Sequence, residues 1–295
     1  MSTYSFRWFR VQAAVPFAAV LAILVAALWI SERAGAQQRQ QDPPAEPEVV
    51  LAPHRATYEM KLSVARPNSG IVEVGGRMVL ETADSCEGWE IKQRIKLTFL
   101  RNDGEEFETD SNFTSYESKD GLELRFSVRN AQNEEVHEEL RGRAELDGLG
   151  GKGRATFSLP ESRSFELPAG TLFPTTHLAR VIKHAREGDK SVSYKVFDGA
   201  RLDGAFNVNA VIGKPPRNPP GTPPVRGDLG LLRGQPAWGV RFAFFASDDL
   251  GAQPEYELAL DLLANGIARS MLLDYGDFAV DARLIQLQAL PRPKC

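Results

Sequence analysis

Cysteine and histidine are scarce in this chain, whose 295 residues include two cysteines and four histidines. No C-x-x-C pair is present, which argues against a redox role for the cysteines. The histidines are too few and too badly spaced for an obvious metal site. We expect solvated or capping histidines and assign no metal ion; the four are His54, His137, His177 and His184.

Catalytic motifs are missing or incomplete. No G-x-S-x-G elbow supports a serine nucleophile. Residues 148–153 match G-x-G-x-x-G, but residues 154–159 alternate like a strand where a dinucleotide site needs a helix, so the glycines indicate a hairpin. Acidic residues within 105–110 and 134–139 alternate with apolar ones or lie in turns, which favours a solvated face. We therefore expect no enzyme activity, no catalytic residue and no cofactor. A glycan hydrolase, which needs two facing carboxylates, ranks last.

Positive charge is not in excess, since the formal net charge is −4. A mildly acidic protein has no electrostatic footprint for nucleic acid, so that class of partner is excluded. Beyond residue 30, no apolar run approaches the length of about 18 residues that a membrane-spanning helix needs.

The N-terminal residues have the pattern of an export signal. Arg7 and Arg10 precede an apolar stretch over residues 11–30, and Ala34-Gly35-Ala36 offers a cleavage site, so we predict a signal peptide over residues 1–36. An uncleaved anchor is the alternative, because about 20 apolar residues can span a bilayer. Either way we expect the remaining chain to lie outside the cytoplasm. If the segment is uncleaved, it is the chain's only expected contact with a membrane.

The two cysteines leave one possible intramolecular pairing in an oxidising compartment. We predict a disulfide between Cys86 and Cys295. In the chain-entropy model, closing so long a loop stabilises the fold by about 5 kcal/mol. We expect this bridge to pin together the two ends of a curled sheet.

Alternating apolar and polar residues dominate the chain after a polar, proline-rich linker at residues 37–50. The pattern recurs between turn signals from residue 54 to residue 290 and predicts ten or more antiparallel strands. A single helix interrupts them, with Thr175 or Thr176 as its N-cap and Gly188 as its end.

A sheet of so many strands must curl or close to protect its edges. We therefore predict an all-β fold with one helix, in which a single curled sheet forms a β-spiral or open barrel. Residues 51–295 form one domain, and residues 213–226 form an exposed proline-rich loop within it.

Several aromatic residues fall at alternating positions of the predicted strands. They would either fill a packed core or line an apolar cavity of the kind that lipid carriers use, and the packed core is the simpler interpretation. The residues are Phe107, Phe113, Phe126, Phe157, Trp238, Phe242 and Phe244.

From about residue 50 to the end, the chain resembles the envelope integrity protein B family. The cysteine arrangement, with a terminal Pro-Lys-Cys, is the most specific part of the resemblance, and the proline-rich stretch at 213–226 is longer than the family leads us to expect. The stretches that carry it are His54-Arg55-Ala56-Thr57-Tyr58, Ser69-Gly70-Ile71, Cys86-Glu87-Gly88-Trp89, residues 173–188, residues 273–278 and residues 290–295.

The resemblance implies a periplasmic protein of antiparallel strands curled into a spiral, stapled by the disulfide between Cys86 and Cys295. It also implies a role in keeping the cell envelope intact under stress, and it brings no catalytic residues. We expect a non-enzymatic protein that binds an envelope protein partner. The alternative is a carrier that holds a lipid or lipopeptide acyl chain in the concave face of the sheet.

Overall fold

The computed structural model describes residues 49–67, 69–202, 204–217, 222–246 and 253–295. The predicted signal peptide at 1–36 and all but the last two residues of the predicted linker at 37–50 lie outside these ranges. The segment from Pro47 to Cys295 forms one compact unit. Within the described residues, no helix is long and apolar enough to cross a membrane.

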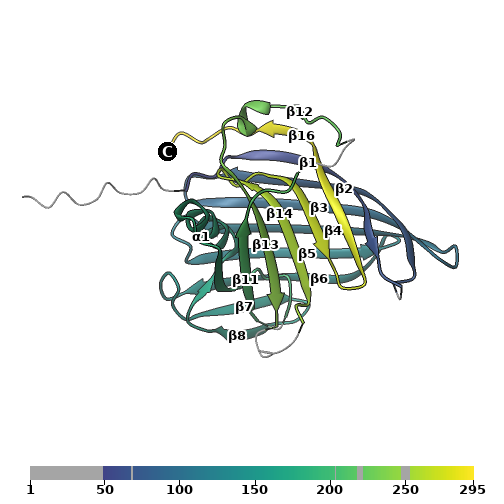
Figure 1. Ribbon diagram of the computed structural model, residues 1–295. Coiled ribbons are helices and arrows are strands. Elements are labelled where there is room, and N and C mark those ends of the chain that lie inside the picture. The colour runs from purple at the N-terminus through teal and green to yellow at the C-terminus, as the bar shows by residue number, and fades with distance from the viewer. Residues whose placement is uncertain (1–48, 68, 203, 218–221, 247–252) are drawn as a thin grey trace, which may run out of the picture. The chain divides into compact units, whose positions relative to one another are not determined.

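Sixteen strands, one α-helix and one short 3-10 helix make up the described fold (Figure 1). Their bounds are β1 His54–Ala65, β2 Ile71–Asp84, β3 Gly88–Arg101, β4 Glu106–Ser118, β5 Glu123–Gln132, β6 Glu135–Leu146, β7 Gly153–Leu159, β8 Arg163–Leu167, β9 Thr171–Leu172, α1 Pro174–Glu187, β10 Ser191–Val196, β11 Phe206–Gly213, β12 Arg226–Gly227, η1 Leu229–Leu232, β13 Ala237–Phe245, β14 Tyr256–Leu263, β15 Ala268–Asp274 and β16 Phe278–Ala289.

All strands belong to a single sheet that closes upon itself almost completely. Its order is β8-β7-β6-β5-β4-β3-β2-β1-β16-β15-β14-β13-β11-β10-β9, with β12 beside β16. Neighbours are antiparallel except for the parallel pairs β9–β10 and β12–β16. Because β1 pairs with β16, the first and last strands meet inside the sheet, and its free edges are β8 and β9. The predicted all-β class with one helix and one curled sheet is confirmed.

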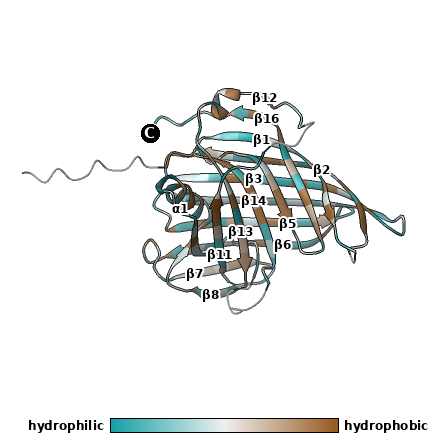
Figure 2. Cartoon of the chain, in the orientation of Figure 1, coloured by the Kyte–Doolittle hydropathy of each residue, from teal (hydrophilic) through white to brown (hydrophobic). Residues whose placement is uncertain are grey.

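The two-residue period of the sequence determines which side chains enter the interior. In β1, Ala56, Tyr58 and Met60 are buried, while Arg55 is exposed. The same alternation of brown and teal runs along most strands (Figure 2). The Asn265-Gly266 turn between β14 and β15 is confirmed, because Gly266 has a φ of +86°, which glycine adopts without strain.

Helix α1 begins earlier than the sequence predicted. Its N-cap is Phe173 and Pro174 occupies the first turn, so the prediction of Thr175 or Thr176 as N-cap is wrong. The predicted end is confirmed, since Gly188 closes the helix in the left-handed conformation. No side chain of the helix itself caps its N-terminus.

The N-terminus of α1 is instead capped from strand β4. The Glu117 carboxylate accepts hydrogen bonds from the backbone N–H of Thr175 at 2.6 Å, from that of Thr176 at 2.7 Å and from the Thr176 hydroxyl at 2.5 Å. Glu117 is 1% exposed, and this burial raises the pKa of its carboxyl group while the three donors act to lower it. One buried side chain therefore holds the helix against the sheet.

The disulfide joins Cys86, in the turn between β2 and β3, to Cys295 at the end of the chain, with their Cα atoms 5.7 Å apart. Before it reaches Cys295, the C-terminal segment passes the start of β1. There the Arg292 side chain donates a hydrogen bond to the carbonyl of Leu51, and the Leu290 N–H donates one to the carbonyl of Pro53. The expectation that the bridge pins the two ends of the sheet is wrong. It reinforces the seam where β1, β2 and β16 already pair.

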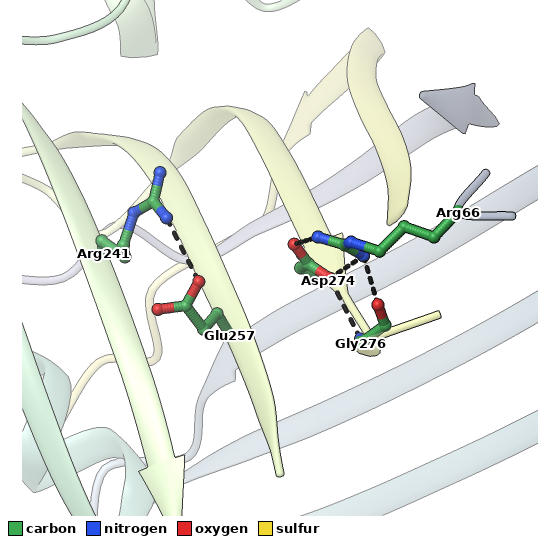
Figure 3. A network of polar contacts seen from close by, with 5 residues as sticks. All are labelled: Arg66, Arg241, Glu257, Asp274 and Gly276. Carbon is green, nitrogen blue, oxygen red and sulfur yellow. Dashed lines mark hydrogen bonds and ion pairs between the residues drawn. The ribbon is translucent and has the colours of Figure 1, made fainter. Parts of the chain in front are cut away.

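A second clamp holds the opposite end of this seam. The Arg66 guanidinium, just after β1, donates to both carboxylate oxygens of Asp274 at 2.9 and 2.8 Å and to the carbonyl of Gly276 at 2.5 Å (Figure 3). Its backbone N–H donates to the carbonyl of Asp277. Arg66 thus ties the β1–β2 connection to the turn between β15 and β16.

The proline-rich stretch at 213–226 falls partly on residues 218–221, which are not described. Its described residues 214–217 follow β11, and its last residue, Arg226, begins the two-residue strand β12. Because β12 pairs parallel with β16 at Gln286 and Leu287, this end of the loop is anchored to the sheet.

Candidate ligand cavity

Between the two halves of the curled sheet lies a cavity of about 640 Å³. Strands β2 to β5 form one wall, strands β11 and β13 to β15 form the opposite wall, and α1 contributes Pro174, His177 and Leu178. In Figure 1 the strands of the second wall lie across those of the first. The volume is within the range of about 300–1,000 Å³ that small-molecule sites occupy.

The wall from β11, β13 and β14 is aromatic. Phe244 stacks on Tyr256 with ring centroids 4.2 Å apart, and Phe206 meets both rings edge-on at 5.8 and 5.9 Å. Phe242 lies 6.3 Å from Phe244. Burial raises the pKa of the Tyr256 hydroxyl far above its usual value, so this ring is uncharged at all physiological pH values. Apolar residues of β14 and β15, among them Leu258, extend this surface.

The wall from β3, β4 and β5 is largely polar. Gln93, Ser111 and Asn130 line it beside Phe113 and Val128. The Asn130 side-chain amide donates to the Glu138 carboxylate at 2.6 Å, so its orientation is held from the next strand. The cavity is therefore amphipathic, with aromatic rings on one side and amide and hydroxyl groups on the other.

His177 lines the cavity from α1. Its ring packs edge-on against Tyr194 at 5.7 Å and Phe242 at 5.5 Å, and burial lowers its pKa from 6.5 to about 4. Its Nε2 is buried without a hydrogen-bond partner among the described residues. A buried nitrogen without a hydrogen-bond partner destabilises the folded protein, and a polar group of a ligand could supply the missing hydrogen bond.

Charged residues gather where the aromatic wall ends. Arg201 forms an ion pair with Glu255 and lies 5.2 Å from the centre of the Phe206 ring. Arg241 donates to Glu257 at 3.1 Å (Figure 3). Arg201 and Glu257 line the cavity.

The seven aromatic residues selected from the sequence divide between the two interpretations. Phe113, Phe242 and Phe244 line the cavity. The others pack in the core. The rings of Phe126 and Phe157 have their centroids 5.0 Å apart, and Phe107 stacks on Phe99 at 4.8 Å. Trp238, partly buried, packs against a cluster of buried residues that includes Val181 and Val240. The alternation identified inward residues, but only the curvature of the sheet decides which of them face empty space.

Two of the four histidines contradict the expectation of solvated or capping roles. His54 and His177 are buried, and burial lowers the pKa of both. His137 is exposed. His184 is near the end of α1, where its Nδ1 meets Asp189 at 2.7 Å and its Nε2 meets the Tyr194 hydroxyl at 2.8 Å.

One group of possible metal ligands does occur in the described residues, formed by His184, Glu187 and Asp189. Both ring nitrogens of His184 already have protein partners, so the contacts present explain this group without a metal ion. The acidic residues at 105–110 and 134–139 face solvent or have polar partners. Arg94 contacts Asp110 at 3.0 and 2.5 Å, and the Asn130 amide donates to Glu138. No pattern in the sequence marked Glu117, the buried carboxylate.

Residues 45–291 match the model of a family described as EipB-like. The chain belongs to the EipB-like family. It is 33% identical to the cell envelope integrity protein EipB of Brucella abortus (strain 2308) over 244 residues, which cover 81% of this chain and 84% of that protein. The family match spans all sixteen strands and ends before Cys295.

A solved structure shares the fold of this EipB-like chain. It is the crystal structure of a β-barrel-like protein of a domain of unknown function from Brucella abortus, with a TM-score of 0.75 and 32% identity. The alignment covers 82% of this chain and all of that one. The resemblance stated from the sequence is confirmed by both comparisons.

Proposed function

We propose that this protein is an exported, non-enzymatic binding protein that maintains the integrity of the cell envelope, and that its cavity holds the apolar chain of an envelope lipid or lipopeptide. The amphipathic cavity is the observation that supports binding of an apolar chain. The name of the Brucella relative and the N-terminal sequence pattern support the first part.

The chemistry of the two walls defines the ligand class. The wall of Phe244, Tyr256 and Leu258 offers a surface to an alkyl chain, whose burial stabilises a complex by about 0.8 kcal/mol per methylene group. Gln93 and Ser111 can bond neutral polar atoms, and the neutral His177 ring offers a further donor or acceptor. An amphiphile with an uncharged polar part near its chain fits these features.

The binding test uses N-phenyl-1-naphthylamine, an uncharged apolar dye whose fluorescence rises in an apolar site. Wild-type protein should bind the dye and release it when a fatty acid or a lysophospholipid is added. Ser111→Trp, which places an indole in the cavity, should abolish both effects. Gln132→Trp is the matched control, because Gln132 is an uncharged, exposed residue of the neighbouring strand β5 and does not line the cavity. Equal dye binding by both variants would contradict the cavity as the site.

An envelope protein is the other partner that we propose, in keeping with the expectation from the sequence. An acylated envelope protein would unite the two proposals, since its acyl chain would occupy the cavity. Photo-crosslinking in intact cells, from a probe at position 111 inside the cavity, tests this directly. Capture of a lipid-modified protein would support a shared site, and crosslinks confined to unmodified proteins would contradict it.

A further inference from the structure

The outer face of strands β3 to β7 carries a groove of about 680 Å³, on the opposite side of the sheet from the cavity. Four cationic side chains line it, namely Lys92, Arg125, Arg141 and Arg143. Hydroxyl groups from β4, β5 and β7 also line it, namely those of Thr114, Ser127, Thr156 and Ser158. Among the described residues lining the groove, Glu90 is the single carboxylate.

Strand register brings the arginines together. Arg125 of β5 lies directly opposite Arg143 of β6, and Arg141 lies on the same face two residues earlier, opposite Ser127. Directly opposite residues of an antiparallel pair have Cβ atoms about 5 Å apart, and like charges in that position destabilise a sheet. The pairing of Arg125 with Arg143 is therefore unfavourable in the protein alone.

The neighbouring carboxylates compensate this charge only weakly. Arg125, Arg141 and Arg143 approach a glutamate two residues away on their own strand, at 3.6, 3.9 and 3.8 Å. None of the three guanidinium groups has a hydrogen bond in the described part of the chain. Arg94, on the same outer face, instead bonds Asp110 through two nitrogens at 3.0 and 2.5 Å. The N–H donors of these three guanidinium groups are therefore available to a ligand.

The backbone adds a second feature at the same place. The register between β6 and β7 shifts between Arg141 and Gly142, so that Arg141 faces Leu159 and Gly142 faces Phe157. Ser158, the extra residue of this bulge, donates its hydroxyl to the carbonyl of Arg141 at 3.3 Å. Bulges redirect side chains next to binding sites. Here the bulge is located within the cationic groove.

We infer that this groove binds a phosphoryl group, with Arg125, Arg141 and Arg143 as its main ligands. The hydroxyls of Thr114, Ser127 and Thr156 are further donors. Arginine forks match the oxygen geometry of a phosphate, and a bridging dianion converts the repulsion between Arg125 and Arg143 into two attractions. The groove and the cavity occupy opposite faces, so this inference does not depend on the proposed acyl-chain site.

The test measures binding to full-length mature protein by calorimetry and by thermal shift. The probes are inorganic phosphate, glycerol 3-phosphate, and vesicles of phosphatidylglycerol or of phosphatidylcholine, with sodium chloride at equal ionic strength as the salt control. Arg143→Gln is the test variant. Arg94→Gln is the matched control, since it removes an exposed arginine of the same face that already has a carboxylate partner.

We expect phosphate or phosphatidylglycerol to bind wild type and the Arg94→Gln variant alike, and to bind the Arg143→Gln variant about tenfold or more weakly. Without ligand, Arg143→Gln should melt no lower than wild type, because it relieves the repulsion. Binding of the soluble phosphates identifies a free phosphoryl compound as the source, and binding of phosphatidylglycerol vesicles alone identifies a lipid headgroup. Failure of every probe with wild type, or equal weakening by both variants, would overturn the inference.

Discussion

Protonation of His177 should make the protein lose stability in mildly acidic solution. The free energy of unfolding depends on pH because the histidine titrates near 6.5 in the unfolded chain, whereas burial lowers its pKa to about 4 in the folded protein. A group with a lowered folded pKa contributes stability above pH 6.5, and this contribution falls as the pH falls toward 4. Between pH 7 and pH 5 the loss is about 2 kcal/mol.

Urea unfolding at pH 7 and pH 5 measures this loss, in wild type and in His177→Phe. Phenylalanine preserves the ring packing against Tyr194 and Phe242 but cannot titrate. The fall in unfolding free energy from pH 7 to pH 5 should be about 2 kcal/mol smaller in the variant, and His137→Gln, a change at an exposed histidine, should match wild type. Equal falls in wild type and His177→Phe would refute the buried, neutral histidine.

Two further predictions concern the Glu117 cap of α1 and the disulfide between Cys86 and Cys295. Glu117→Ala leaves two backbone N–H groups of α1 without their partner and should lower the free energy of unfolding in urea by about 3 kcal/mol. The control Glu123→Ala, at an exposed residue, should lower it by under about 0.5 kcal/mol. A loss of less than about 1 kcal/mol for Glu117→Ala would argue against the cap. Cys86→Ser should lower the melting temperature of the oxidised protein to that of wild type treated with dithiothreitol and should weaken envelope protection in cells, and two free thiols in the exported wild type would disprove the bridge.

Local patterns in the sequence were sufficient for most of the strands and for the end of the helix. The alternation around Tyr58 and the glycine at 188 act over a few residues, so one sequence reveals them. The edge strand β8 has only a weak pattern in the sequence, because Arg163–Leu167 is short and three of its five residues are exposed. Strand β12 consists of two residues, which are too few to show an alternating pattern.

The functional features depend on distant pairing, which no local pattern reports. Glu117 caps a helix that begins 57 residues later in the chain, at Pro174. Arg125 faces Arg143 because the β5–β6 hairpin turns at Asn133 and Glu134, both with positive φ, and the turn determines the register. The cavity depends on how far the sheet curls. The sequence pattern of an inward-facing phenylalanine is the same whether its ring lines a cavity or packs against another side chain.

Native mass spectrometry of the protein purified from its own envelope tests the central claim most directly. The account predicts that wild type carries a lipid or an acyl-bearing peptide. Ser111→Trp, with its cavity filled, should be isolated without this ligand, while the control Gln132→Trp should retain it. A wild-type protein that is uniformly free of any apolar ligand, under conditions that preserve known lipid complexes, would contradict the claim.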